Sequence, residues 1–219
     1  MKNLKTNLFV IAGFILLASC QKENLIGSGR VIEQQRTVTS LNKIVCSGVF
    51  DVFISQDDTE SLSVITDDNL MDVVKTYTVG NTLYLELEED INLKKVSKME
   101  IYVSVIELSE LNFSGVGNIN GINLQLDDFE LNASGVGDIE LSGTSNYFYL
   151  NNYGVGNINA FDFVSNHVTI ESSAVGQIKV NAVETISITS TGVGDIFYKG
   201  NPQVNKLNIN GTGQVTKID

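Results

Sequence analysis

The sequence predicts an all-β fold, a single-stranded β-helix (β-solenoid) with coils of about 19–20 residues and an irregular N-terminal capping region. Three observations lead to this prediction. A decapeptide such as "NASGVGDIEL" recurs six times, the residues around each copy alternate between apolar and polar, and the chain has one proline. That proline, Pro202, falls between two coils, where the loss of an N–H donor does little harm.

The repeat has a nearly constant period. Its leading small residues are Gly115, Gly135, Gly154, Ala174, Gly192 and Gly211, at intervals of 20, 19, 20, 18 and 19 residues. A looser copy, "IVCSGVFDVFI", surrounds Gly48. A fixed period in this range is typical of solenoids, in which each repeat forms one coil and the stack buries a common core.

Aliphatic residues occupy fixed positions in every copy. Four residues before the leading residue stand Leu111, Leu131, Leu150, Ile170, Ile188 and Leu207. Four residues after it stand Ile119, Ile139, Ile158, Ile178, Ile196 and Val215. Even offsets are mostly apolar and odd offsets mostly polar, which is the pattern of strands with one buried face. We therefore expect Leu131, Leu150 and Ile170 to lie directly above one another, about 4.8 Å apart.

A glycine and a polar residue follow each leading residue. The second glycines are Gly117, Gly137, Gly156, Gly176, Gly194 and Gly213. The polar residues are Asn118, Asp138, Asn157, Gln177, Asp195 and Gln214. We expect the glycines to turn a corner at positive φ, and the polar column to form a hydrogen-bonded ladder.

Other glycine motifs fit less well. A phosphate-binding loop needs a following Lys-Ser or Lys-Thr and a helix, and a dinucleotide fingerprint needs a third glycine that opens a helix. The calcium nonapeptide repeat is the serious rival, but only Asp138 and Asp195 place a carboxylate in the polar column. Structural turns are favoured, and the sequence predicts no metal and no cofactor.

The N-terminus predicts export and lipid anchoring. Lys2 and Lys5 precede the apolar run "LFVIAGFILLA", which is too short for a lasting bilayer span and is typical of a signal peptide, here residues 1–19. The following "LASC" resembles the lipobox of bacterial lipoproteins, which implies cleavage before Cys20 and acylation of that cysteine. A plain secretory signal with a stray cysteine is the alternative.

The chain is acidic, with a formal charge of −12. Removal of residues 1–19 takes away two lysines and no acid, leaving about −14. Such a surface disfavours nucleic acid and anionic headgroups, so the expected membrane contact is the acyl anchor at Cys20. We expect the protein to be anchored in the cell envelope, on the outer membrane. The residues after Cys20, "QKEN", do not decide between its periplasmic and its outward-facing side.

Residues 20–36 are polar and are expected to be a tether, followed by one solenoid head domain over residues 37–219. Within it, residues 41–110 are irregular. Residues 82–90 and 98–108 alternate as strands, Gly80-Asn81 marks a hairpin, and residues 67–77 suit a short helix with Asp67 or Asp68 as N-cap. This segment is expected to form broader coils and to cover one end of the stack.

The remaining cysteine has no expected chemistry. If Cys20 is acylated, Cys46 has no disulfide partner. It lies in the apolar stretch "KIVCSGV", so a buried inert thiol is expected.

The chain resembles a known family at this point. "GVFDVFISQ", "TLYLEL" and the "SGVGDI" repeat are similar to those of the "putative auto-transporter adhesin, head GIN domain" family, over about residues 40–217. The resemblance implies a β-helical fold on a secreted or anchored bacterial protein.

No catalytic residue is predicted. The one histidine, His167, lies at an outward offset, and acids such as Asp127 and Asp128 lie in turn-like runs. Column arithmetic places Tyr147, Tyr149 and His167 together on the outside as a candidate patch for a glycan or protein ligand. The alternative is that outward tyrosines merely suit strands or are covered by a subunit.

These observations favour a non-catalytic binding or adhesion module. Two other functions stay open, a structural envelope protein that self-associates as a homo-oligomer and, at lower weight, a carbohydrate-active β-helix enzyme.

Overall fold

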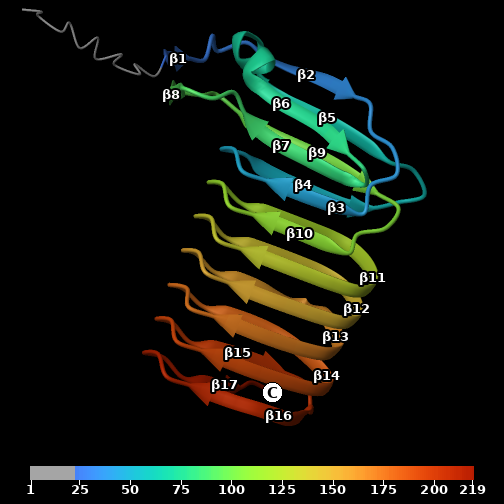
Figure 1. The fold of residues 1–219 in the computed structure, drawn as a ribbon, viewed down its shortest axis with the longest axis vertical. Helices are drawn as coiled ribbons and strands as arrows, with labels where there is room; N and C mark the ends of the chain where they lie inside the picture. Colours follow the sequence, from blue (N-terminus) through green and yellow to red (C-terminus); the bar gives the residue numbers. More distant parts are fainter. Residues whose placement is uncertain (1–22) are drawn as a thin grey trace, which may run out of the picture.

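The computed structural model describes residues 23–219, so the predicted signal peptide and Cys20 lie outside the described residues. The fold is an all-β solenoid of stacked parallel coils (Figure 1). The strands are β1 (Glu23–Ile26), β2 (Val31–Arg36), β3 (Lys43–Cys46), β4 (Asp51–Gln56), β5 (Ser61–Asp67), β6 (Val74–Val79), β7 (Thr82–Leu87), β8 (Ile91–Lys95), β9 (Met99–Val105), β10 (Glu110–Phe113), β11 (Ile119–Ala133), β12 (Ile139–Asn152), β13 (Ile158–Ser172), β14 (Ile178–Ser190), β15 (Ile196–Lys199), β16 (Gln203–Ile209) and β17 (Val215–Lys217), and η1 (Asp68–Val73) is a 3-10 helix.

The regular coils stack in the predicted register. β11, β12, β13 and β14 pair in parallel with one another, and Leu131 pairs with Leu150, which pairs with Ile170. All three are buried. Their alternating pattern buries one face of each strand, and the next coil covers it, so the prediction of vertical aliphatic ladders is confirmed.

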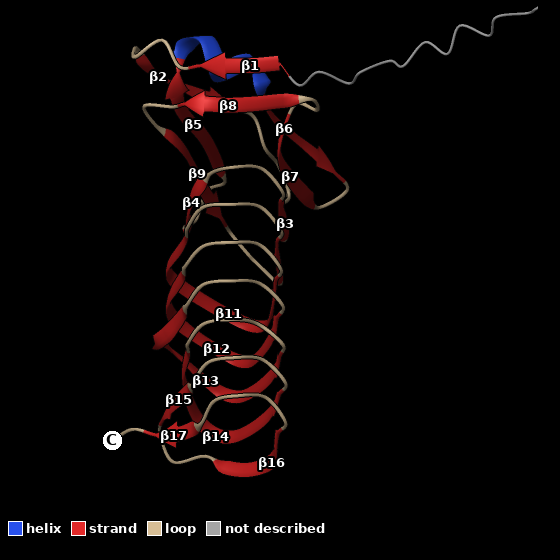
Figure 2. Cartoon of the chain, turned by 90° about the vertical axis from the view of Figure 1, so that its left-hand side faces the viewer, coloured by secondary structure: helices blue, strands red, loops and turns tan. Residues whose placement is uncertain are grey.

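The predicted corners are confirmed as well. The second glycine of each copy has positive φ, as at Gly137 with φ 149°. A Cβ at Gly137 would lie 1.8 Å from the carbonyl oxygen of Gly117 in the coil before. Only a residue without a side chain fits, because the backbone conformation and the contact between coils both exclude a Cβ. Figure 2 views these corners face on, as a regular series of loops.

The polar column binds backbone rather than forming a pure side-chain ladder. Asn118 Oδ1 accepts the N–H of Asp138 (3.1 Å), and Asp138 Oδ1 accepts the N–H of Asn157 (2.7 Å). Asp195 Oδ1 accepts the N–H of Gln214 in the same way (2.9 Å). These oxygens satisfy N–H groups that the corner would leave free. Among residues 23–219, no group of three or more His, Cys, Asp or Glu side chains could hold a metal ion.

The coil of Gly48 takes a place that the sequence period does not predict. β3 lies between β7 and β10, and β4 lies between β9 and β11. The chain therefore builds this coil first, leaves it to form the irregular segment, and returns to stack the next coil on it. Val49 accordingly bridges Val116, far along the sequence.

Antiparallel strands cover the N-terminal end. β2 pairs with β5, β5 pairs with β9, β6 pairs with β7, and β1 forms a separate parallel pair with β8. The predicted tether over residues 20–36 therefore differs from the structure, since residues 23–26 and 31–36 are paired strands. β2 is an edge strand with a mostly exposed, polar sequence, and that composition does not distinguish it from a tether.

The predicted helix is a short 3-10 helix, and Asp67 precedes it without capping it. Asp67 is instead fully buried. Its Oδ1 accepts the N–H of Gly29 (2.7 Å) and its Oδ2 accepts the N–H of Ser97 (2.7 Å). One carboxylate thus joins β5, the N-terminal segment and the loop before β9.

The C-terminal coil is open. Leu207 belongs to the aliphatic column that is expected inside, yet it is 57% exposed. It differs from Leu150 because no described coil lies beyond β16 to cover it. Proximity to the end of the stack, and not its offset in the repeat, decides its burial.

Candidate functional site

An aromatic cluster lies on the outer wall formed by β12 and β13. The rings of Tyr147 and His167 stack with centroids 4.6 Å apart, and those of Tyr147 and Tyr149 lie nearly parallel with centroids 6.2 Å apart. Both tyrosines are exposed, at 37% and 40%. The structure thus brings together all three residues that column arithmetic placed side by side. Their role in binding stays a prediction.

The register of the strands positions this cluster. Tyr147 pairs with His167 across β12 and β13, so their side chains leave the wall one above the other. Phe148, between the two tyrosines, points inward and stacks on Phe129 with centroids 5.8 Å apart. Because Phe148 is packed in the core, the backbone under both tyrosines is rigidly held.

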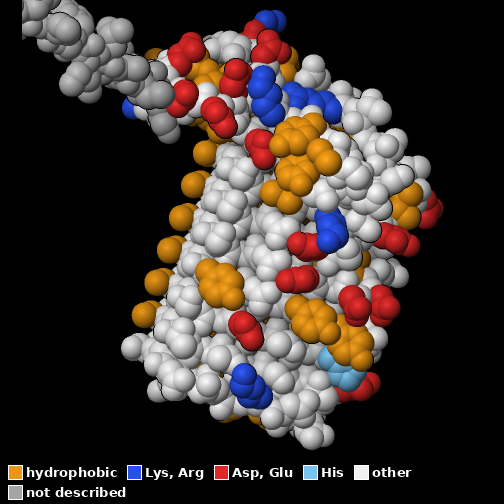
Figure 3. Space-filling model, viewed as in Figure 1, with side chains coloured by type: hydrophobic (Ala, Val, Ile, Leu, Met, Phe, Trp, Pro, Cys, Tyr) orange, Lys and Arg blue, Asp and Glu red, His pale blue; other side chains and the backbone are white. Residues whose placement is uncertain are grey.

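Carboxylates adjoin the cluster on the preceding coil. Asp128 pairs with Tyr147, and Glu130 pairs with Tyr149. Asp128 is exposed, while Glu130 is half-buried and accepts a hydrogen bond from Asn151 (3.1 Å). Figure 3 shows the histidine and hydrophobic side chains on this wall with acidic side chains close by. Sequence analysis considered acids and aromatics separately and missed this juxtaposition, although the same column arithmetic could have found it.

His167 contacts a hydroxyl and a carboxylate, which is the residue set of a nucleophilic triad. Its Nδ1 lies 2.9 Å from Thr185 Oγ1, and its Nε2 lies 3.6 Å from Glu184 Oε2. The second distance is too long for the hydrogen bond that orients a catalytic histidine, and Glu184 is largely exposed. The three groups lie on an open wall, so the arrangement does not support nucleophilic catalysis.

A hollow of about 490 Å³ adjoins the cluster. It lies between the loop that joins β9 to β10 and residues 125–128 of β11. Its lining residues include Gln56, Glu107, Gln125, Asp127 and Asp128. Asp128 therefore belongs both to the rim of the hollow and to the neighbourhood of Tyr147.

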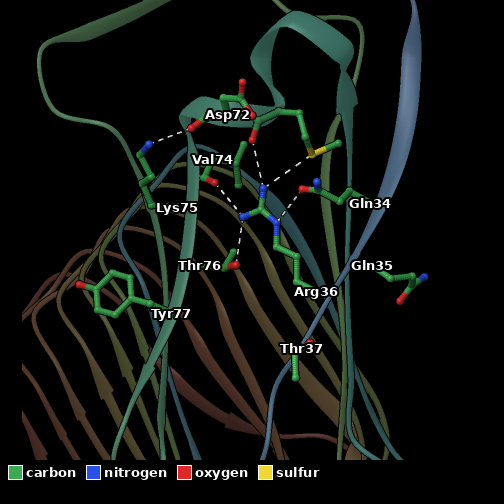
Figure 4. Close-up of a pocket in the computed structure, with 10 residues that line it drawn as sticks. Gln34, Gln35, Arg36, Thr37, Asp72, Val74, Lys75, Thr76 and Tyr77 are labelled. Atoms are coloured by element: carbon green, nitrogen blue, oxygen red, sulfur yellow. Dashed lines mark hydrogen bonds between the residues drawn. The ribbon is translucent and has the colours of Figure 1, made fainter.

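A second hollow, of about 580 Å³, is lined by Arg36 and its neighbours in the capping region (Figure 4). The Arg36 guanidinium donates to Gln34 Oε1 (3.1 Å), to Val74 O (2.7 Å), to Thr76 Oγ1 (3.0 Å) and to Met71 O (3.0 Å). Every nitrogen of the guanidinium already has an acceptor. This arginine fastens β2 to η1 and β6, and it offers no free donor to an anion.

A column of exposed valines runs along the corners. Its members are Val49, Val116, Val136, Val155, Val175 and Val193, which are 45–53% exposed. Figure 3 shows an evenly spaced row of hydrophobic side chains along one edge. The odd offset of these valines in the repeat could have signalled their exposure. Bridges between successive valines continue the stack at the corners.

Cys46 is buried in β3, and burial raises the pKa of its thiol to about 12. The thiolate is the reactive form, so a thiol with such a pKa is unreactive at neutral pH.

No helix within residues 23–219 has the length and apolar character needed to cross a membrane.

Known proteins share the sequence pattern and the fold of this chain. The family described as "Putative auto-transporter adhesin, head GIN domain" matches residues 40–202. The chain belongs to this family. The predicted family is therefore confirmed, and no curated protein matches the chain.

Crystal structures of similar proteins share the fold. One from Bacteroides fragilis, described as a putative adhesin, is 28% identical with a TM-score of 0.75, over 89% of this chain and 100% of that one. One from Parabacteroides distasonis, described as a putative lipid binding protein, is 25% identical with a TM-score of 0.54, over 90% and 100%. One from Parabacteroides merdae, described as a putative adhesin, is 18% identical with a TM-score of 0.55, over 88% and 99%, and supports the fold alone.

Proposed function

We propose that the protein is a lipid-anchored β-solenoid of the cell envelope that acts as a non-catalytic binding or adhesion module. The family and the solenoid fold fit a binding module. The anchor is expected at Cys20, next to the N-terminal end of the described fold, with the outer membrane as the expected location. The stack would then extend its side wall away from its attachment point.

One observation carries the binding role. Tyr147, Tyr149 and His167 form a stacked cluster on a rigid wall, in which both tyrosines are exposed and His167 is half-buried. Clustered aromatics on a rigid surface supply contact area with little loss of conformational entropy, as binding surfaces require.

A binding panel tests this role. The unacylated mature chain, from Cys20 onward, is applied to a glycan array and to immobilised extracellular proteins. Tyr147→Ser with Tyr149→Ser should reduce binding to the positive ligands by about ten-fold or more, as expected for loss of an aromatic anchor. Tyr153→Ser is the matched control, because Tyr153 is exposed but its ring is not stacked on the cluster. Equal binding by all three folded proteins would refute the role of the cluster.

Anchoring has a separate test. The full chain, expressed in a bacterium with lipoprotein processing, should incorporate labelled fatty acid and partition into detergent. Cys20→Ala should abolish both properties. Continued acylation of that variant would contradict anchoring at Cys20.

Self-association is the second candidate function, favoured by the open C-terminal end. Leu207 and Val204 are 57% and 46% exposed there, and β16 has one unpaired edge. Light scattering on the unacylated mature chain should show a concentration-dependent rise in mass under this hypothesis. A constant monomer mass would exclude it.

A further inference from the structure

We propose that the acidic wall patch, defined as Asp127, Asp128, Glu130, Tyr147 and Tyr149, binds cationic side chains of a polypeptide partner. This inference rests on the proposed binding function and names the class of ligand. The chemistry is that of Lys or Arg side chains on an extended segment. The register of the wall, the pairing of its charges and the adjoining hollow support it independently.

The register places an acidic residue on the coil before each tyrosine. One face of the Tyr147 ring is covered by His167, which stacks on it from the following coil. The opposite face is directed toward the preceding coil, where Asp128 is the residue in register. Tyr149, whose ring is nearly parallel to that of Tyr147, has Glu130 in register on the preceding coil. Each exposed tyrosine thus has an acidic residue as its neighbour in the stack.

This combination is selective for positive charge. An ammonium or guanidinium group is attracted by the face of an aromatic ring, and a carboxylate adds a charge-assisted hydrogen bond. A neutral sugar would use the ring face but would gain no charge–charge attraction from two adjacent acids. An anionic ligand would be repelled, as it would be by the chain as a whole, whose formal charge is −12.

The charge pairing of the wall shows where a cation is missing. Glu110 occupies the same column as Glu130 one coil earlier, and Lys43 Nζ lies 2.6 Å from its Oε2. Among residues 23–219, no lysine or arginine forms an ion pair with Asp127, Asp128 or Glu130. The wall therefore pairs Glu110 directly with Lys43, gives Glu130 only a longer-range attraction to the same lysine, and leaves Asp127 and Asp128 without an ion-pairing lysine or arginine in the described part of the chain.

The adjoining hollow extends the patch. Glu107, Asp127 and Asp128 line it, together with the amides of Gln56 and Gln125. From the coil of Asp128 to that of His167 the wall spans two coil spacings, or about 10 Å. An extended polypeptide covers that length with about three residues. A segment with two cationic side chains can thus place one over the tyrosines and one in the hollow, which a single small amine cannot do.

The probe is the peptide acetyl-Arg-Gly-Arg-Gly-Arg-amide, compared with its counterpart in which neutral citrulline replaces each arginine. The chain has no tryptophan and seven tyrosines, so ring-labelled tyrosine gives few signals to follow by NMR. Tyr147→Phe and Tyr149→Phe assign the two rings of interest. The arginine peptide should shift these two signals, with an affinity that falls as salt is raised, and the citrulline peptide should not.

A charge-matched pair of variants identifies the site. Asp128→Asn with Glu130→Gln should weaken binding of the arginine peptide by about five-fold, from the loss of two charge contacts at a partly exposed site. Glu89→Gln with Asp162→Asn makes the same change of net charge at exposed positions outside the patch and should alter binding less than about two-fold. Thermal melts of both double variants establish that each remains folded.

Three outcomes would overturn the inference: equal binding of the citrulline peptide, equal loss in both double variants, or no shift of the Tyr147 and Tyr149 signals. A shift of these signals by neutral oligosaccharides alone would also overturn it and would identify the patch as a sugar site. The proposed function is judged separately, since loss of panel binding in the tyrosine-to-serine variant supports a binding module even when the arginine peptide fails to bind.

Discussion

The two ends of the stack are built in different ways. At the N-terminal end, antiparallel pairs, the β1–β8 pair and the helix η1 lie over the first coils. At the C-terminal end, β16 and β17 simply repeat the pattern of the coils before them, and Leu207 remains largely exposed. The contrast separates what a repeated sequence specifies from what it does not. A repeat specifies contacts between neighbouring coils, whereas the cover of an end requires a segment that departs from the repeat.

The largest expected effect comes from a corner inside the stack. Gly137→Ala should lower the free energy of unfolding by about 3–5 kcal/mol, because the new Cβ meets a backbone oxygen at 1.8 Å and the residue is at positive φ. Gly213→Ala makes the same change in the last coil and should cost less than about 1 kcal/mol of global stability, because that coil can shift or fray alone. Urea unfolding followed by circular dichroism measures both. Equal losses would mean that the end coil is as constrained as the interior.

The aliphatic column gives the next largest effect. Leu150→Ala should destabilise the protein by about 2–5 kcal/mol, because Leu150 is fully buried and leaves a cavity between two coils. Leu207→Ala, in the same column of the open coil, should change stability by no more than about 0.5 kcal/mol. Urea unfolding followed by circular dichroism measures the loss of stability in both variants. A large loss at Leu207 would indicate that another chain covers this end in solution.

The same contrast explains which parts of the structure could be predicted from the sequence. The positions of Leu131, Leu150 and Ile170 follow from a period and an alternation, which are local properties of the chain. The cluster of Tyr147, Tyr149 and His167 follows from the same columns, since residues at equal offsets must lie above one another. Each of these predictions needs only the spacing between neighbouring coils.

The pairings of the capping region could not be predicted in this way. β3 pairs with β10, and β4 with β11, across an intervening segment of different architecture, and no periodicity reports such a return of the chain. β2 has a polar, exposed sequence that is equally suited to a tether. The burial of Leu207 also depends on what lies beyond it, which its offset does not encode.

Asp67 provides a smaller effect that is confined to the capping region. Burial raises the pKa of its carboxyl, but the hydrogen bonds from Ser97 and Gly29 outweigh burial and lower the pKa below its ordinary value. Asp67→Asn removes one acceptor and should cost about 1–3 kcal/mol near neutral pH. Asp162→Asn, at an exposed position, is the control and should be nearly neutral.

The pH dependence of that effect has a definite sign. A carboxyl whose pKa is lowered by folding stabilises the protein above its unfolded pKa of about 3.9, and this contribution is lost as the pH falls through the folded value. The gap in unfolding free energy between the wild type and Asp67→Asn should therefore narrow as the pH falls from 7 to below about 3. Urea unfolding across this range measures the gap. A gap that widens on acidification would contradict the hydrogen-bonding role of the ionised carboxylate.

The smallest perturbation uses Cys46 as a reporter of which end opens first. Cys46 lies in β3, between β7 and β10, and its pKa of about 12 leaves almost no thiolate, so a thiol reagent should label it only when the surrounding coils open. Opening that begins in the capping region should expose Cys46, so Asp67→Asn should accelerate labelling at pH 7. Fraying of the last coil should not reach β3, so Leu207→Ala and Gly213→Ala should leave the labelling rate unchanged. If these C-terminal variants accelerate labelling as much as Asp67→Asn does, the stack opens as one cooperative unit, and the two ends differ in architecture without differing in dynamics.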